Sequence, residues 1–289
     1  MSETVGFLGL GIMGRPMAEN LAKKFRVVGF DSQESKFHGI LGVERADSAA
    51  SVAGQCSVVC LSLPSAAIVE SVILAPGGLI DTLAEGSLIL DLSTGLPSVS
   101  RRISAAVAVR NIGYADVPVS GGEAGAKAAA LAIMVGASQG DYLRALPYLS
   151  ALGSSVIRAG EVGAGNVAKL VNNMIVGVTF GVISEGFSLA VKNGLDPLVL
   201  YQAIQGGWAG SKVLDVSAPA IAARQYLPGG TINMMQKDLS YARTLAAESQ
   251  ASIPMTAAAH EIFVAAQAMG RGAESQPAIF ELWARQEAP

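Results

Sequence analysis

A glycine-rich turn near the start of the chain decides its fold: residues 5–14 have the sequence VGFLGLGIMG. An apolar strand runs into a G-x-G-x-x-G pattern, and a helical segment follows. In such a turn Gly9 permits the sharp bend, Gly11 lets the backbone approach a pyrophosphate, and Gly14 lets the helix pack against the strand. The helix N-terminus offers its free N–H groups to the phosphates. The pattern predicts a dinucleotide site formed by Gly9, Leu10, Gly11, Ile12, Met13 and Gly14.

An acidic residue at the end of the next predicted strand supports this interpretation. Asp31 follows the apolar run 26–30, where a carboxylate accepts hydrogen bonds from the ribose hydroxyls of the dinucleotide. It would repel the extra phosphate of NADP, and the next three residues, 32–34, include no Lys or Arg to bind that phosphate. We therefore expect NAD as the cofactor and NADP as the less favoured one. The alternative is a glycine turn that binds no ligand.

Short apolar runs alternate with helical segments up to about residue 162, which predicts a Rossmann-type, doubly wound, mostly parallel sheet with helices on both faces. Beyond Gly163 the strand patterns stop and long helical patterns follow. We expect an α/β fold with a cofactor-binding domain at 1–162 and an all-helical domain for substrate and oligomerisation at 163–289. The predicted strands are Thr4–Gly9, Arg26–Asp31, Ser57–Leu63, Ser87–Ser93, Ile112–Val119, Leu131–Val135 and one near Ser154–Ala159. The main predicted helices are Ile12–Lys24, Ala66–Leu74, Ser98–Val109, Asp141–Leu152, Asn166–Lys192, Pro197–Ile204, Lys212–Ala223, Asn233–Glu248 and Pro254–Met269.

Composition limits the partners of the chain. Of its 289 residues 51% are hydrophobic and 15% charged, and the net charge of −3 gives no basic field for nucleic acid or an anionic membrane. The only cysteines, Cys56 and Cys60, match neither a disulfide framework nor a metal site. With no export signal, we expect a cytoplasmic protein without a metal. The apolar stretch Ile175–Ser184 is too short to span a membrane, and such a helix favours a homodimer or homotetramer that covers it.

Two loops after later strands are predicted to border the cofactor, because ligands of doubly wound sheets lie at the carboxyl ends of the strands. The first contains Leu63 and Pro64, and the second contains Thr94. Either loop could instead be only a turn.

Three further segments carry candidate substrate-binding or catalytic groups. Ser120, Gly121 and Gly122 can present a hydroxyl and backbone N–H groups to a carboxylate, although a plain glycine-rich connection has the same pattern. Lys169 and Asn173 are four residues apart and share a helix face, with Asn172 beside them; the alternative is a lysine that extends to the surface. Lys237 precedes Asp238 on a predicted helix, where a solvated Lys–Asp pair is the alternative.

Taken together, these segments resemble the four characteristic regions of the β-hydroxyacid dehydrogenases, in their usual order and spacing. The regions are Gly9–Ala18, Asp116–Gly122, Gly163–Asn173 and Lys237–Leu239, and the match spans nearly the whole chain. Within the family, Gln205–Ser211 followed by Val213–Asp215 is most similar to the tartronate semialdehyde (2-hydroxy-3-oxopropionate) reductases.

The resemblance implies hydride transfer between NAD(H) and a small carboxylate-bearing hydroxyacid or semialdehyde, with Lys169 as proton donor and acceptor. It also implies that Ser120, Gly121 and Gly122 hold the substrate carboxylate, that Asn172 and Asn173 orient the substrate, and that Lys237 contacts both substrate and nicotinamide. The sequence departs from related reductases at Gly229-Gly230, at Ala128–Ala130 and at Trp208, which leaves the exact substrate open. Alternatives are a 3-hydroxyisobutyrate or sugar-acid dehydrogenase, and an inactive dinucleotide-binding module that serves in assembly.

Overall fold

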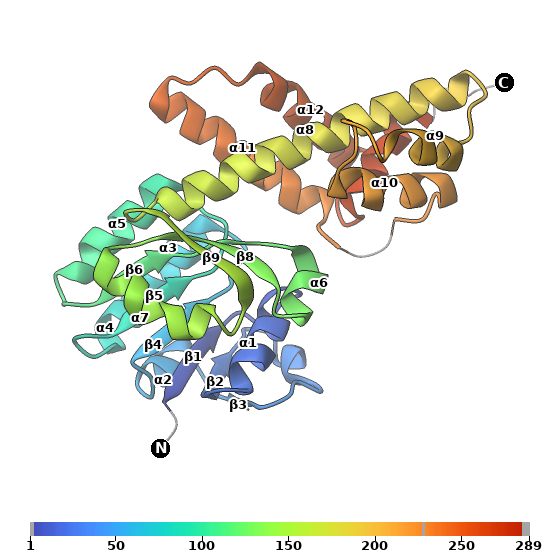
Figure 1. Ribbon diagram of the computed structural model, residues 1–289. Helices are drawn as coiled ribbons and strands as arrows, with labels where there is room; N and C mark the ends of the chain where they lie inside the picture. Colours follow the sequence, from blue (N-terminus) through green and yellow to red (C-terminus); the bar gives the residue numbers. More distant parts are fainter. Residues whose placement is uncertain (1–2, 227–228, 285–289) are drawn as a thin grey trace. The chain divides into compact units, whose positions relative to one another are not determined.

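The computed structural model describes residues 3–226 and 229–284. The chain divides into two compact units, Met1–Lys169 and Leu170–Pro289, and each is considered by itself below. The first unit is built on a β-sheet and the second consists of helices (Figure 1). The boundary that the sequence predicts at residue 163 remains a prediction.

The described strands of the first unit form one sheet in the order β3-β2-β1-β4-β5-β6-β8-β7, with β9 paired to β8. Pairing is parallel from β3 to β6, and β8 runs antiparallel to β6 and β7. The mostly parallel, doubly wound sheet is thus confirmed. The strands are β1 Thr4–Leu8, β2 Arg26–Phe30, β3 Val43–Arg45, β4 Val58–Leu61, β5 Leu88–Asp91, β6 Gly113–Asp116, β7 Val119–Ser120, β8 Leu131–Gly136 and β9 Gly153–Gly160.

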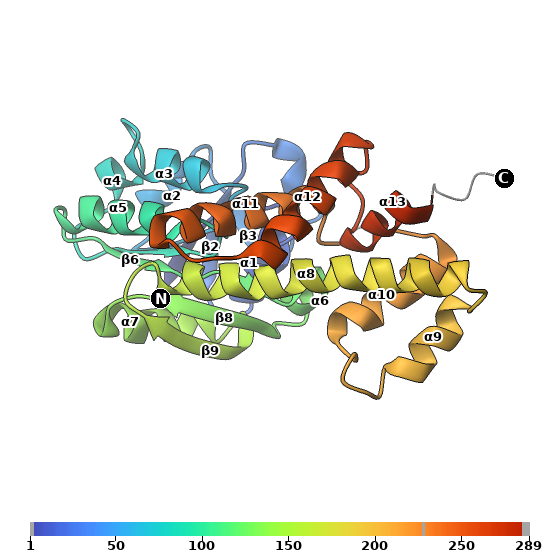
Figure 2. The same cartoon turned by 90° about the horizontal axis from the view of Figure 1, so that it is seen from above.

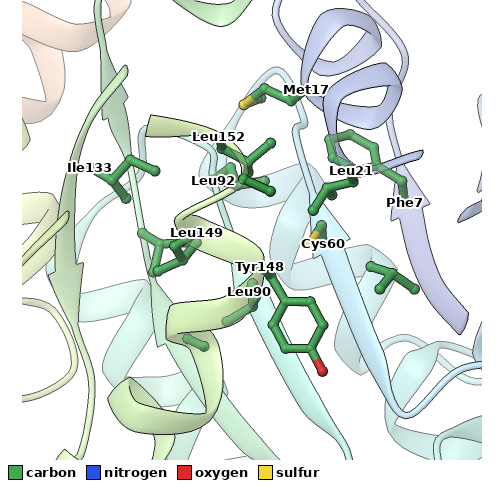
Figure 3. Close-up of a cluster of buried hydrophobic side chains, with 14 of the residues drawn as sticks. Phe7, Met17, Leu21, Cys60, Leu90, Leu92, Ile133, Tyr148, Leu149 and Leu152 are labelled. Carbon is green, nitrogen blue, oxygen red and sulfur yellow. The ribbon is translucent and has the colours of Figure 1, made fainter. Parts of the chain in front are cut away.

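Central strands β4 and β5 are buried along their whole length, because helices cover the sheet on both faces (Figure 1). On one face α1 and α7 pack against side chains from β1, β4 and β5, as Figure 3 shows for Phe7, Met17, Leu21, Cys60, Leu90, Tyr148 and Leu149. The helices of this unit are α1 Gly14–Ala22, α2 Ala49–Ala53, α3 Ala66–Leu74, α4 Leu79–Thr82, α5 Pro97–Ala108, α6 Gly122–Lys127 and α7 Gln139–Leu149, with the 3-10 turn η1 at Glu34–Phe37.

The strand predicted at Ile112–Val119 is interrupted in the structure. Strands β6 and β7 follow one another along the antiparallel neighbour β8, with Asp116 opposite Gly136 and Val119 opposite Ile133. These pairs share one register, so the chain continues in the same direction across the gap. Pro118 lies in the gap and has no N–H to donate, which explains why the strand is broken there.

The second unit is formed by helices in the part of it that the structure describes. Two apolar clusters hold it together: α11 and α12 pack on α8 around Phe180 and Phe263, and α10 packs on α8 around Phe187 and Leu214. Figure 2 shows α9 and α10 beside the C-terminal half of α8. The helices are α8 Ala164–Lys192, which begins in the first unit, α9 Pro197–Ile204, α10 Lys212–Ala223, α11 Ile232–Ser249, α12 Pro254–Ala268 and α13 Glu281–Ala284, with the 3-10 turn η2 at Gln276–Phe280.

By length and hydropathy α8 could cross a membrane, and 33% of its most apolar window is buried. The helix also carries Asn166, Lys169 and Asn173, all buried. Both asparagines hydrogen-bond other parts of the fold. Burial of polar groups with protein partners is typical of a core helix.

Candidate active site

The glycine turn after β1 has the geometry that its sequence predicts. Gly9 adopts a φ of 92°, which favours glycine, and its N–H donates to the Phe30 carbonyl oxygen at 3.0 Å. A Cβ at Gly14 would overlap the Gly9 carbonyl oxygen, so only glycine lets α1 begin this close to the turn. A Cβ at Gly11 would meet nothing within 4 Å. The turn is therefore tight where it packs and open where a ligand would approach.

The N-terminus of α1 lacks a side-chain cap. Its N-cap residue is Met13, which cannot accept the hydrogen bonds that Ser, Thr, Asp or Asn accept there. The first N–H groups of an α-helix have no partner within the helix, and together with the helix dipole they favour an anion. This end of α1 fits a phosphate group.

Asp31, at the end of β2, accepts a hydrogen bond from the backbone of the same turn. Its Oδ2 accepts the Leu10 N–H at 2.7 Å, and its Oδ1 accepts the Gln33 N–H at 2.8 Å. A carboxylate with two oxygens can accept further hydrogen bonds from ribose hydroxyls. These features fit the adenosine half of NAD.

The structure places a cation next to β2 that the sequence motifs did not indicate. Arg45 on β3 forms an ion pair with Glu34, and its guanidinium lies over the Phe37 ring with 5.8 Å to the centroid. The guanidinium lowers the pKa of the exposed Glu34 carboxyl by hydrogen bond and charge. In the structure the Arg45 charge is paired with the exposed carboxylate of Glu34.

The two loops predicted to border the cofactor are joined by a hydrogen bond. The Leu63 N–H donates to Ser93 Oγ at 2.9 Å, and the Ser93 N–H donates to the buried carboxylate Asp91 Oδ1 at 3.0 Å. Pro64 is exposed and Thr94 half-buried. The loops after β4 and β5 therefore hold one another in a fixed conformation at the carboxyl ends of their strands.

The predicted carboxylate-binding segment lies at the end of β7 and the start of α6. Ser120 is half-buried, and Gly121 and Gly122 are exposed. Both glycines have positive φ, 134° and 61°, so a side chain at either position would strain the backbone. The conformation turns the chain sharply into α6 and explains the need for two consecutive glycines.

Lys169 lies on the second turn of α8 and is only 9% exposed. A lysine that extends to the surface exposes its ammonium, and the low exposure of Lys169 favours the buried alternative. Asn173 follows one turn later, and Asn172 Nδ2 donates to Asn173 Oδ1 at 2.9 Å. The helix therefore presents a buried lysine and a buried amide in succession.

In the second unit one carboxylate joins two predicted site residues. Asp238 on α11 is 6% exposed; its Oδ2 accepts Asn173 Nδ2 at 2.6 Å, and its Oδ1 lies 3.2 Å from Lys237 Nζ. The Lys237 ammonium also lies 5.3 Å from the centroid of the Tyr241 ring. The pair is thus not a fully solvated Lys–Asp surface, and Asp238 sets the positions of both neighbours.

The structure gathers the predicted residues into two sets, one in each unit, and adds residues that sequence reasoning missed. The missed ones are Asp116, Asn166, Asp238 and Tyr241. Asp116, Asn166 and Asp238 stand inside the segments that carry the resemblance, but no role was assigned to them. Their signal was a polar side chain in an apolar strand or helix, because such a group is stable there only with a partner.

The departures noted in the sequence have distinct environments. Trp208, in the turn between α9 and α10, is fully exposed. Ala129, which follows α6, adopts the left-handed φ of 52° that glycine prefers. A Cβ at Gly230 would come within 3.0 Å of the Gln276 side chain, so this position has little space for a larger residue.

Comparison with known families accounts for both halves of the chain. Residues 4–160 match the NAD-binding domain of 6-phosphogluconate dehydrogenase. Residues 163–283 match the NAD-binding domain of NADP-dependent 3-hydroxyisobutyrate dehydrogenase.

Curated relatives are similar over nearly their whole length. The chain is 38% identical to 3-hydroxyisobutyrate dehydrogenase of Pseudomonas aeruginosa over 90% of each chain. It is 35% identical to 2-(hydroxymethyl)glutarate dehydrogenase of Eubacterium barkeri, covering 96% of this chain and 94% of the relative. It is 34% identical to 2-hydroxy-3-oxopropionate reductase of Escherichia coli over 92% of each.

Solved structures give the same result. Mycobacterium tuberculosis 3-hydroxyisobutyrate dehydrogenase, determined with L-serine, superimposes over the full length of both chains with a TM-score of 0.87 at 30% identity. The 3-hydroxyisobutyrate dehydrogenase of Salmonella typhimurium covers 97% of this chain and 99% of its own with a TM-score of 0.89 at 26% identity.

Proposed function

The chain belongs to the family of β-hydroxyacid dehydrogenases that includes 3-hydroxyisobutyrate dehydrogenase, and we propose that it reduces tartronate semialdehyde to glycerate with NADH. The observation that carries the proposal is the buried Lys169 on α8, followed one turn later by Asn173. A buried ammonium beside an amide suits proton transfer to a carbonyl oxygen that the amide orients.

The cofactor would be held by the glycine turn, by Asp31 and by the loops that contain Leu63, Pro64 and Thr94. When bound, NADH supplies the hydride that the carbonyl carbon accepts. Lys169 then donates a proton from its ammonium to the carbonyl oxygen, which becomes the hydroxyl of the product. In the oxidative direction the neutral Lys169 amine takes that proton back.

Substrate binding is assigned to groups that suit a small carboxylate. Ser120 offers its hydroxyl, and Gly121 and Gly122 offer backbone N–H groups without a side chain in the way. Asn172 and Asn173 would orient the carbon that bears the oxygen, and Lys237 adds a positive charge held by Asp238.

The substrate class is supported by what the relatives' names share. 3-Hydroxyisobutyrate, 2-(hydroxymethyl)glutarate and glycerate, the reduced form of 2-hydroxy-3-oxopropionate, each carry a hydroxymethyl group on the carbon next to a carboxylate. We therefore assign this chain a substrate with a carboxylate and a neighbouring CH₂OH or CHO group. A second candidate is 3-hydroxyisobutyrate, favoured by the 38% identity to the Pseudomonas enzyme.

An initial-rate assay with purified protein tests the proposal. Tartronate semialdehyde should be reduced with NADH faster than with NADPH, because the Asp31 carboxylate repels the extra phosphate and Arg45 is already paired with Glu34. Lys169→Ala should lower kcat by about 10³-fold while NADH still binds, since general acid catalysis contributes about 10²- to 10⁴-fold. NADH binding without turnover on tartronate semialdehyde, 3-hydroxyisobutyrate or a sugar acid would instead indicate an inactive binding module.

We also propose a cytoplasmic homodimer or homotetramer. Ile175, Val182 and Leu189 lie seven residues apart on α8 and are each more than half exposed, which gives the helix an apolar stripe. A second copy of the chain would cover this stripe. Light scattering of the purified protein measures the assembly directly.

A further inference from the structure

Asp116, at the end of β6, accepts hydrogen bonds from the N-terminal N–H groups of α8. Its carboxylate is fully buried, with Oδ1 accepting the Gly163 N–H at 2.6 Å and Oδ2 accepting the Asn166 N–H at 2.7 Å. Helix N–H groups at this position have no partner within the helix, and the two side-chain oxygens of Asp116 supply the acceptors that they lack. Both oxygens of one side chain are used to hold the start of one helix.

Two glycines allow this close approach. A Cβ at Gly165 would overlap the Asp116 carbonyl oxygen, and a Cβ at Gly136 would overlap the Asp116 carboxylate. The first turn of α8 therefore rests directly on the backbone of β6 and β8. A side chain at either glycine would move the helix away from the sheet.

Asn166 ties the same turn to a second part of the unit. It is fully buried; its Oδ1 accepts the Gly95 N–H at 2.8 Å, and its Nδ2 donates to Ser100 Oγ on α5 at 3.0 Å. Gly95 follows Thr94, a predicted cofactor residue. The asparagine thus connects the loop after β5 to the helix that carries Lys169.

A second buried carboxylate extends the connection along the sheet edge. Asp91 lies opposite Asp116 in the parallel pair β5–β6. Its two oxygens accept the Tyr114 hydroxyl at 3.1 Å and the Ser93 N–H at 3.0 Å. The loops after β4 and β5 and the start of α8 therefore share one layer of buried hydrogen bonds.

We propose that Asp116 and Asn166 are positioning residues, which form a buried clamp that fixes the first turn of α8, and with it Lys169, against the loop that carries Thr94. Lys169 is three residues after Asn166, so a shift of the first turn displaces the lysine directly. The inference rests on the proposed role of Lys169 in proton transfer. Neither clamp residue needs to touch the substrate or the cofactor.

Two variants remove the two halves of the clamp, and a third is a matched control. Asp116→Asn turns one acceptor oxygen into a donor that faces an N–H group, and Asn166→Ala removes both side-chain hydrogen bonds. Asn20→Ala is the control, because Asn20 is also buried in this unit and also donates to a carbonyl oxygen, that of Ala126, at 2.7 Å. If Asp116→Asn does not fold, Asn166→Ala carries the test.

Hydrogen–deuterium exchange of the full-length protein measures the clamp, and kinetics measure its effect. We expect faster exchange in the peptide 163–169 for both clamp variants and not for Asn20→Ala. Because a displacement of about 1 Å costs up to about 10²-fold in rate, kcat should fall about 10- to 100-fold with little change in the KM of tartronate semialdehyde.

Unchanged exchange in residues 163–169 would overturn the clamp itself. Faster exchange with a normal kcat would overturn its role in positioning Lys169. If Lys169→Ala has no effect on turnover, the proposed function fails instead, while the exchange pattern still reports whether the clamp exists.

Discussion

The N-termini of α1 and α8 both have N–H groups without a partner inside the helix, but only α8 has a side chain that accepts them. At α1 the N-cap is Met13, no side chain caps the helix, and the space beside Gly11 is open. At α8 the carboxylate of Asp116 occupies the equivalent position and is fully buried. Both ends favour an anion. At α8 the carboxyl oxygens of Asp116 accept the N–H groups where the helix must stay in place, whereas at α1 the N–H groups are left to a ligand where binding is needed.

The largest expected effect comes from closing the open end. Gly11→Ala should weaken NADH binding about 100-fold, equivalent to about 2.7 kcal/mol, because a Cβ would occupy the space where the pyrophosphate approaches the backbone. The free protein should be unaffected, since that Cβ meets nothing within 4 Å. Fluorescence titration with NADH and a thermal unfolding scan measure the two properties.

Gly14→Ala is the contrasting variant for this experiment. Its Cβ would overlap the Gly9 carbonyl oxygen, so both stability and NADH binding should fall. Tight NADH binding by Gly11→Ala would show that the open N-terminus of α1 does not receive the pyrophosphate, and the contrast with α8 would fail.

A smaller effect is expected at the N-terminus of α8, where Asp116 makes the free energy of unfolding depend on pH. Burial raises the pKa of Asp116 from 3.8 to about 7, although the Gly163 and Asn166 N–H groups act to lower it; the neighbouring Asp91 raises it further. Because the folded-state pKa is raised, the contribution to stability is complete below about pH 4 and is lost as the pH rises through about 7. From pH 5 to pH 8 the wild type should lose about 2 kcal/mol relative to Asp116→Asn.

Urea unfolding of both proteins at several pH values checks this prediction. The other titratable group that faces Asp116 from its own strand is Tyr114, whose pKa burial holds well above its usual value. From α5, the Arg101 guanidinium lies beside Gly163. These groups are present in both proteins, so the comparison isolates the Asp116 carboxyl together with its coupling to Asp91 and Tyr114. Parallel stability curves from pH 5 to pH 8 would show that Asp116 does not titrate in this range.

The smallest effect is expected at a helix with an ordinary cap. Ser138 caps α7 through its Oγ, which accepts the Asp141 N–H at 3.1 Å near the surface. Ser138→Ala should cost about 1 kcal/mol of stability and leave NADH binding and kcat unchanged. A loss of activity in this variant would mean that any weakened helix end disturbs the site, and that α8 is not special.

Local sequence was sufficient to predict the phosphate-binding N-terminus of α1, but not the hydrogen bonds from the N-terminus of α8 to Asp116. Gly9, Gly11, Gly14 and Asp31 lie within 23 residues, and their spacing alone determines a strand, a turn and a helix. Asp116 and Asn166 are 50 residues apart and meet only because β6 and the start of α8 lie at the same sheet edge. No periodic pattern records such a pairing.

The elements missed from sequence were short. Strand β3 has three residues and α4 has four, too few to show a period of 2 or 3.6, whereas α3, α9 and α10 begin and end at the predicted residues. The break between β6 and β7 depends on a single proline, which the apolar run around it concealed.

The exposed turn between α9 and α10 also gives the protein an optical reporter. The chain contains two tryptophans; Trp208 is fully exposed, whereas Trp283 is half-buried. Water-soluble quenchers will therefore reach the Trp208 indole first and separate its emission from that of Trp283. Any ligand or second subunit that covers this turn will shift the emission to shorter wavelength, so binding and assembly can be followed without adding a label.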